Sequence, residues 1–300
     1  MSDPLAPIQI DTRLRLGPAL VRLRLRGASG PLLNEDDLAR RWGPFILPGD
    51  PDEDDVDEDI AVDLVSTEGP WPRTGRLITD NTLTARQREG QWRLSRADVD
   101  VALTPSILMA EGEIAPHLPA VEECVRFLMW LFLTGAGRSG LLLHAATTTQ
   151  GGLAFCFPAY GGTGKSTLAS LTPGDGALSD ELSLLTLEGG QWRAWPCPFW
   201  NWPRQLSPEV DTSRSYPLTS LSFLRQSPAT RWSPLRADDA LTQLMEQAVA
   251  FDAFPVASNR TFNLAADLIE ALRGQGRVGQ LHLLKGDDPY AILRPDQGPA

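Results

Sequence analysis

The sequence has 300 residues, of which 42% are hydrophobic and 22% are charged. This length corresponds to one large domain or two ordinary ones, and the apolar content is enough for a packed core, which excludes a wholly disordered or collagen-like chain. The net charge of −11 excludes a general nucleic-acid-binding protein, because such a protein needs a net basic face.

The acidity of the chain is concentrated in one short segment. Residues 50–59 contain eight Asp or Glu side chains, and without them the net charge is only −3. A run of like charges is typical of a solvated loop, and docking of a basic partner is the alternative interpretation.

Cysteine usage and the N-terminus indicate the compartment. Cys124, Cys156 and Cys197 are far apart and form no CxxC pair, so we expect no disulfide framework, no zinc site and a reducing environment. The N-terminus has neither the basic nor the apolar region of a signal peptide, and the longest apolar stretch, 127–133, is too short for a membrane helix. We therefore expect a cytoplasmic protein that binds neither a membrane nor nucleic acid, and a homo-oligomer stays open.

Residues 1–118 predict a smaller, β-rich N-terminal module. Apolar residues alternate with Arg over 21–26, which is the period of a half-buried strand. A short helix follows, with Asn34 as its N-cap and Gly43 at its end. Further strands are predicted over residues 60–65, 76–79, 91–94 and 99–103, and their spacing indicates an antiparallel arrangement.

Residues 119–300 predict an α/β domain. An apolar helix is expected over 119–133, ended by the glycines that follow. Two continuous apolar runs, 140–148 and 151–157, have the length and composition of buried strands. After them we expect a helix from Ser166, strands over 182–187, 218–224, 278–284 and 290–293, helices over 238–251 and 263–273, and an irregular Trp- and Pro-rich segment over 189–217.

A glycine-rich segment follows the second apolar run and reads AYGGTGKST over residues 159–167. This is the context of a Walker A loop, in which backbone N–H groups and a helix N-terminus surround phosphate oxygens. Lys165 would reach the β- and γ-phosphates, and Ser166 would ligate Mg²⁺. Ala159 replaces the first glycine of the motif.

Lysine usage supports this interpretation, because only two of the 27 basic residues are Lys and one of them is Lys165. The alternative is a glycine turn with an exposed lysine. The residues predicted to bind the phosphates of ATP are Gly161, Gly162, Thr163, Gly164, Lys165, Ser166 and Thr167.

Two further features could complete the chemistry of a phosphate site. Asp180 and Glu181 precede a predicted strand, and such carboxylates can hold Mg²⁺ or accept the proton of an incoming hydroxyl. A charged turn is the alternative. His144 lies in the first apolar run, where a lone histidine is more often a satisfied core residue than a functional one.

The order of the segments LLHAATT, FPAYGGTGKSTLA and LSDELSLL resembles the C-terminal catalytic domain of HPr kinase/phosphorylase and its relatives, over about residues 140–290. The resemblance implies a phosphoenolpyruvate-carboxykinase-like P-loop kinase domain. It also implies that Asp180 and Glu181 share metal and general-base roles and that His144 lies beside these acids. The second acid is Glu181 where that family has Asp, and the family's downstream glycine-containing signature is absent, which indicates a divergent member.

These features together predict an ATP- and Mg²⁺-dependent kinase that transfers the γ-phosphate to a hydroxyl, on Ser or Thr of a protein or biosynthetic peptide. The predicted catalytic residues are Lys165, Asp180, Glu181 and His144, and the predicted metal ligands are Ser166 and Asp180. Two other functions stay open, a non-catalytic nucleotide sensor or scaffold and a small-molecule kinase of the same fold.

The residues that would bind the phosphate acceptor are less clearly marked in the sequence than the phosphate loop is. The stretch 192–203 with Trp200, Trp202 and Arg204 is a candidate wall of the acceptor site, and packing of these aromatic residues onto the core is the alternative. Arg260 is a candidate clamp for developing phosphate charge.

Overall fold

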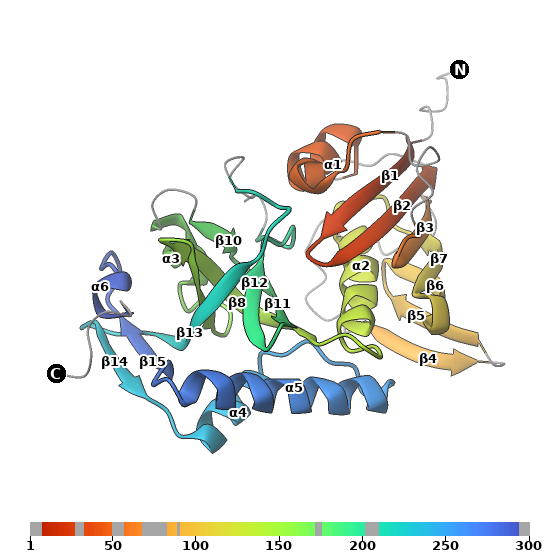
Figure 1. The fold of residues 1–300 in the computed structure, drawn as a ribbon. Helices are drawn as coiled ribbons and strands as arrows, with labels where there is room; N and C mark the ends of the chain where they lie inside the picture. The colour runs from red at the N-terminus through yellow and green to blue at the C-terminus, as the bar shows by residue number, and fades with distance from the viewer. Residues whose placement is uncertain are drawn as a thin grey trace. The chain divides into compact units, whose positions relative to one another are not determined.

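The computed structural model describes residues 8–27, 33–49, 57–67, 83–88, 91–171, 176–201 and 210–293. Within these residues the protein is mixed α/β, with two sheets and six α-helices (Figure 1). The chain divides into two compact units. Unit 1 consists of Met1–Gly135 and Phe251–Pro255, and unit 2 consists of Ala136–Ala250 and Val256–Ala300.

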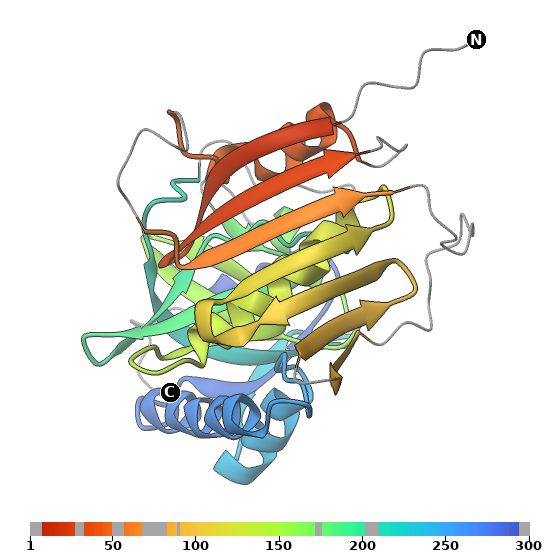
Figure 2. The same cartoon turned by 90° about the vertical axis from the view of Figure 1, so that its right-hand side faces the viewer.

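Unit 1 is built on a seven-stranded mixed sheet (Figure 2). Its strands are β1 (Ile8–Leu16), β2 (Ala19–Gly27), β3 (Ile60–Ser66), β4 (Thr84–Arg88), β5 (Gln91–Arg96), β6 (Val99–Thr104) and β7 (Met109–Ile114). Their order is β1-β2-β3-β7-β6-β5-β4. The pairs β2–β3 and β3–β7 are parallel, so the antiparallel prediction is wrong there, because long connections return these strands in the same direction.

The period-two pattern in β2 is confirmed. Leu23 and Leu25 are buried, whereas Arg22, Arg24 and Arg26 point away from the core. Arg22 makes two hydrogen bonds of 2.9 Å to the carboxylate of Asp11 in the neighbouring strand. The outer face of this sheet is therefore lined by paired charges. The strand predicted over residues 76–79 lies outside the described residues.

Helix α1 (Glu35–Trp42) of unit 1 follows the capping signals of its sequence. It begins after Asn34, whose side chain accepts the N–H of Asp37 at 2.8 Å, and it ends at Gly43 as predicted. Helix α2 (Leu118–Leu133) packs on β3 and β7.

Helix α2 therefore belongs to unit 1, and the division between the units falls after Gly135, later than the boundary expected between residues 118 and 119. Phe251 and Phe254 come from the far end of the chain and pack their rings against Phe127 of α2, at centroid distances of 4.7 and 5.5 Å. This aromatic cluster explains why residues 251–255 are part of unit 1.

Unit 2 is built on an eight-stranded mixed sheet. Its strands are β8 (Gly140–Gln150), β9 (Leu153–Pro158), β10 (Ala177–Ser179), β11 (Leu182–Glu188), β12 (Gln191–Trp195), β13 (Tyr216–Gln226), β14 (Arg231–Pro234) and β15 (Val278–Leu283). The order is β10-β8-β11-β12-β13-β15-β14, and β9 pairs with β8 and β13. The pairs β9–β13 and β13–β15 are parallel, and the other pairs are antiparallel.

The helices of unit 2 are α3 (Lys165–Leu171), α4 (Ala237–Met245), α5 (Pro255–Arg273) and α6 (Tyr290–Leu293), with Pro255 itself counted in unit 1. The strand predicted over 290–293 is wrong. The amide of Leu293 turns back to the carbonyl of Pro289 at 3.2 Å, and the Tyr290 ring packs on Phe155. No helix in the described part of the chain is both long and apolar enough to span a membrane.

Among its described residues, the segment predicted to be irregular over 189–217 contains β12 and the first two residues of β13. Gly189 and Gly190 have φ values of +56° and +81°, which is the backbone of a tight hairpin turn, and they reverse the chain between β11 and β12. The pair of glycines was therefore a turn signal inside a segment otherwise dominated by Trp and Pro.

Candidate phosphate-binding site

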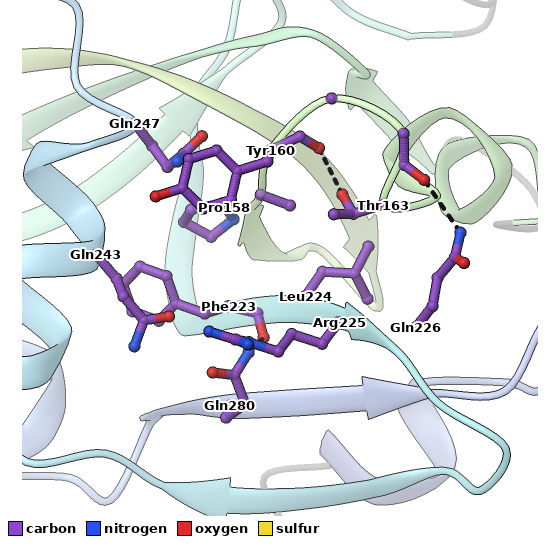
Figure 3. A pocket seen from close by; sticks show the side chains of 13 residues that line it. Pro158, Tyr160, Thr163, Phe223, Leu224, Arg225, Gln226, Gln243, Gln247 and Gln280 are labelled. Atoms are coloured by element: carbon purple, nitrogen blue, oxygen red, sulfur yellow. Dashed lines mark hydrogen bonds between the residues drawn. The ribbon is translucent and has the colours of Figure 1, made fainter.

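The glycine-rich loop connects β9 to α3, as the sequence predicted. Gly162 and Gly164 have φ values of +78° and +99°, a left-handed conformation that other residues adopt at a cost. Two side-chain hydrogen bonds hold the loop: Thr163 Oγ1 donates to the carbonyl of Tyr160 at 2.7 Å, and Gln226 Nε2 donates to the carbonyl of Gly162 at 3.1 Å (Figure 3). One hydrogen bond within the loop and one from β13 therefore stabilise its conformation.

The side chain of Lys165 folds back over the beginning of the loop. Its ammonium donates to the carbonyl oxygens of Ala159 at 2.6 Å and Tyr160 at 3.1 Å, and only 9% of the residue is exposed. Burial lowers the pKa of Lys165, while the negative charges of Glu181 and Asp180 act in the opposite direction. The alternative of an exposed lysine beside a glycine turn is therefore wrong.

The acidic pair lies in the turn between β10 and β11. Asp180 is fully buried, and its Oδ1 accepts the backbone N–H of Asn201 at 2.9 Å. Glu181 is partly exposed, and its carbonyl oxygen accepts the N–H of Ala145 at 3.1 Å. The two adjacent acidic residues therefore have different environments, because Asp180 is enclosed by protein and Glu181 is partly exposed.

Asn201 joins the loop helix to the acidic turn. Its backbone N–H binds Asp180, and its side-chain Nδ2 donates to the hydroxyl of Ser166 at 3.1 Å. The two residues predicted as metal ligands are thus separated by a single bridging residue. No motif marks Asn201 in the sequence, because it stands among the Trp and Pro residues of an irregular segment.

Strand β8 places His144 between these two parts of the site. The carbonyl of His144 accepts the N–H of Ala159 at the start of the loop, at 3.3 Å, and the next residue in the strand, Ala145, binds the carbonyl of Glu181. The His144 residue is exposed, although its neighbours in the strand are buried. The alternative of a core histidine is therefore wrong.

A buried group of hydroxyls and a thiol supports the acidic turn from below. Ser183 donates to the carbonyl of Ala145 at 3.0 Å, accepts from Thr147 at 2.6 Å, and lies 2.9 Å from the hydroxyl of Ser179. Burial raises the pKa of the neighbouring Cys156 thiol to about 12, against the effect of hydrogen bonds with Thr147 and Ser183. These hydrogen bonds connect β8, β10 and β11 next to the turn that carries Asp180 and Glu181.

The residues predicted for the acceptor side of the site are Trp200, Trp202, Arg204 and Arg260, and the structure describes two of them, Trp200 and Arg260. Trp200 is buried and donates its indole N–H to the carbonyl of Cys197 at 2.7 Å, so it packs in the core instead of forming an acceptor wall. Trp202, Pro203 and Arg204 lie outside the described residues. Arg260 donates to the carbonyl of Arg138 before β8, at 2.5 Å, which gives it a structural contact.

The donor set fits a magnesium ion that is bound together with phosphate. Hydroxyl and carboxylate oxygens are the ligands that Mg²⁺ prefers, and Ser166 and Asp180 supply one of each. Among the described residues, no group of three or more His, Cys, Asp or Glu side chains could hold a metal without other ligands. A metal here would therefore need oxygens from a phosphate ligand and water.

The fold and this site define a mixed α/β protein with a glycine-rich, phosphate-loop-like segment in unit 2. The family model of SynChlorMet cassette protein ScmC matches residues 117–273, slightly more than half of the chain. The chain therefore belongs to the ScmC family. No curated protein matches the sequence.

The family match corrects the resemblance to HPr kinase/phosphorylase, because the matching family is a different one. The motifs that carried the resemblance are short, and phosphate loops followed by an acidic residue occur on unrelated proteins. Ala159 and Glu181 were already departures from the expected pattern.

Proposed function

We propose that unit 2 is a P-loop kinase domain and that the protein transfers the γ-phosphate of ATP, in the presence of Mg²⁺, to a Ser or Thr hydroxyl of a protein or peptide. The observation that carries this proposal is the cluster formed by Lys165, Ser166, Asp180 and Glu181, joined through Asn201 and β8. Phosphoryl transfer needs this combination, because its catalysis depends on positioning and on compensation of charge.

The loop and its lysine are proposed to bind the triphosphate. Backbone N–H groups of residues 161–167 would donate to phosphate oxygens, and Gly161 and Gly162 have open space where a side chain would otherwise be. The Lys165 ammonium would exchange its bonds to the carbonyls of Ala159 and Tyr160 for bonds to the β- and γ-phosphates. Mg²⁺, when bound by Ser166 and Asp180, would neutralise charge on the same phosphates.

Glu181 is the proposed general base. Its side chain belongs to a partly exposed residue, whereas Asp180 is fully buried and engaged with Asn201. Glu181 would take the proton of the acceptor hydroxyl while the hydroxyl oxygen bonds to the γ-phosphorus. The bond from that phosphorus to the β–γ bridging oxygen breaks, and ADP leaves with the electron pair. His144 stays in the proposed site, because β8 places it between the loop and the acids.

The proposal is tested by incubating the protein with ATP, Mg²⁺ and a mixed library of Ser- and Thr-containing peptides. Mass spectrometry should find phosphopeptides, formed together with ADP. Glu181→Gln should reduce transfer by about 10²–10⁴-fold and change ATP affinity by less than about twofold. Glu270→Gln, on the exposed face of α5, is the matched control and should retain full transfer. Undiminished transfer by Glu181→Gln would contradict the assigned role.

A second candidate function is a nucleotide-binding sensor or scaffold without transfer. The full burial of Asp180 favours it, because a carboxylate enclosed by protein must be uncovered before it can touch a metal ion. Tight binding of ATP with formation of neither ADP nor phosphopeptide would identify this function.

A further inference from the structure

A pocket of about 290 Å³ lies beside the glycine-rich loop, within unit 2 (Figure 3). One wall is the loop itself, from Pro158 to Thr163, and another is β13 from Phe223 to Gln226. Gln243 from α4, Gln247 just after this helix and Gln280 from β15 complete the lining. The loop that is proposed to hold phosphate thus also forms one side of this pocket, which is open to solvent on another side.

The chemistry of this lining is unusual because it combines apolar walls with several carboxamides. Phe223 and Leu224 are buried and offer apolar surface. Gln280 is buried too, and its Nε2 donates to the carbonyl of Phe223 at 2.5 Å, which fixes the direction of its amide group. None of the described residues that line the pocket is Asp or Glu. Arg225 also lines the pocket and brings a positive charge to it. The pocket therefore suits a flat group without positive charge that has both donors and acceptors at its edge.

Gln247 is the most enclosed of the carboxamides. Only 4% of the residue is exposed, its backbone carbonyl accepts the N–H of His144 at 2.7 Å, and, like Tyr160, it lines the pocket (Figure 3). Gln243 lies four residues earlier on the same side of the pocket. Both side chains line the pocket, and each carboxamide carries N–H donors and an oxygen acceptor that can face a ligand there.

Tyr160 adds an aromatic surface at the loop. The residue is 56% exposed, and its hydroxyl donates to the carboxylate of Glu246, which holds the ring in place. A ring held in this way can stack on a heteroaromatic group.

We propose that this pocket binds the base of the nucleoside triphosphate, with Gln243 and Gln247 reading its edge. A carboxamide offers an N–H donor and an oxygen acceptor side by side, which matches the paired acceptor and donor positions of a nucleobase. The acceptor hydroxyl of the transfer reaction has to reach Glu181, which does not line this pocket, so the pocket is not the acceptor site. This inference rests on the proposed binding of a triphosphate at the loop.

The test compares ATP with inorganic tripolyphosphate, which carries the phosphates but no base, as competitors of a fluorescent ATP analogue. The wild-type chain should bind ATP at least about tenfold more tightly than tripolyphosphate. The double variant Gln243→Met/Gln247→Met keeps the size of both side chains and should lose this preference, while its affinity for tripolyphosphate stays within about twofold. Gln275→Met, at an exposed position after α5, is the matched control and should keep the preference.

The outcomes separate the two proposals. Equal binding of ATP and tripolyphosphate by the wild type, or an equal loss of both ligands in the double variant, would overturn the base pocket and leave the phosphate loop standing. Binding of neither ligand by the wild type would overturn both. Thermal unfolding of each variant ensures that the comparison is made between folded proteins. If the double variant is unstable, Gln247→Met alone is measured in the same way, and it should show a smaller loss of the preference for ATP over tripolyphosphate.

Discussion

Lys165 carries its charge in an environment that disfavours it. The residue is 9% exposed, and burial lowers the pKa of its ammonium below the ordinary value of 10.5. Its two hydrogen bonds go to backbone carbonyls, not to a carboxylate. A buried ammonium that is hydrogen-bonded only to backbone carbonyls lowers the free energy of unfolding. Ligand binding therefore explains the presence of Lys165 better than a contribution to stability does.

We therefore predict that Lys165→Met is at least as stable as the wild type at pH 7. The sign follows from the lowered pKa, because below that pKa the folded protein carries the buried charge, whereas the variant does not. The advantage of the variant should shrink as pH rises through the lowered pKa of Lys165, where the folded wild type loses its proton. Urea unfolding at pH 7 and at pH 10 measures both effects. A clear loss of stability in Lys165→Met at pH 7 would show that the ammonium serves the fold.

The sequence identified most of the individual side chains of the candidate site but not their connections. The loop and the acidic pair were visible because their residue types and their order are characteristic of phosphate chemistry. Asn201 and the carboxamides of the pocket could not be predicted, because their roles depend on contacts between segments that are distant in sequence and that only the folded sheet brings together. Gln243 and Gln280, for example, are 37 positions apart in sequence and line the same pocket.

At the scale of elements, Asn201 connects helix α3 to the turn before β11. Asn201→Ala removes the side-chain bond to Ser166 and keeps the backbone bond to Asp180, so it tests the link alone. We expect the affinity for ATP in the presence of Mg²⁺ to fall about tenfold, because the Ser166 hydroxyl loses the group that orients it. Without Mg²⁺ the variant and the wild type should bind ATP alike.

Calorimetric titration with ATP, with and without Mg²⁺, measures this difference. Asn263→Ala, at an exposed position of α5, is the control and should behave as the wild type does. A loss of affinity in Asn201→Ala that is the same with and without Mg²⁺ would show that Asn201 supports the loop in general and not the metal ligands.

Unit 1 contains a carboxylate that joins the β5–β6 turn to the start of α2. Asp98 is almost fully buried, at 3% exposed, and accepts hydrogen bonds from Arg96 at 2.5 Å and from His117 at 2.8 Å. Burial alone would raise the pKa of Asp98, but the bonds from His117 and Arg96 outweigh it and lower the pKa to about 2.

Asp98→Asn should lower the free energy of unfolding by about 1–2 kcal/mol at pH 7, after allowance for solvent screening. The contribution of this carboxylate is complete above its unfolded pKa of about 3.9 and is lost as pH falls towards its folded pKa. Urea unfolding of the wild type and the variant should therefore differ at pH 7 and converge near pH 2. Asp267→Asn, at an exposed position of α5, is the control. A difference that does not change with pH would contradict the assignment.

Elements with strong local signals were predicted well, and those set by tertiary contacts were not. The cap at Asn34 and the alternation over 21–26 determine α1 and β2 by themselves. The parallel pairs β2–β3 and β3–β7 depend on how long connections cross the sheet, which local patterns do not contain. The apolar content of segment 290–293 suits either a strand or a buried helical turn. The segment is helical in the structure, where the ring of Tyr290 packs on Phe155 of β9.

At the scale of the whole molecule, the family match and the candidate site coincide. The match covers residues 117–273, from the cap of α2 to the end of α5, and all residues of the proposed phosphate and metal site lie inside it. The strands of unit 1 precede the match. The chemistry proposed here therefore belongs to the part of the chain that defines the family, and of the pocket residues named above only Gln280 lies beyond it.

The proposed site binds a nucleoside triphosphate through the backbone of the loop from Gly161 to Thr167 and through the side chain of Lys165. Calorimetric titration of the full chain with ATP and Mg²⁺ tests this proposal most directly, with Lys165→Met compared with Lys285→Met, a change of the exposed second lysine of the chain. The wild type and Lys285→Met should each bind one ATP per chain, and Lys165→Met should bind ATP at least about 100-fold more weakly. No heat of binding in the wild type, or equal affinities in both variants, would contradict the proposal.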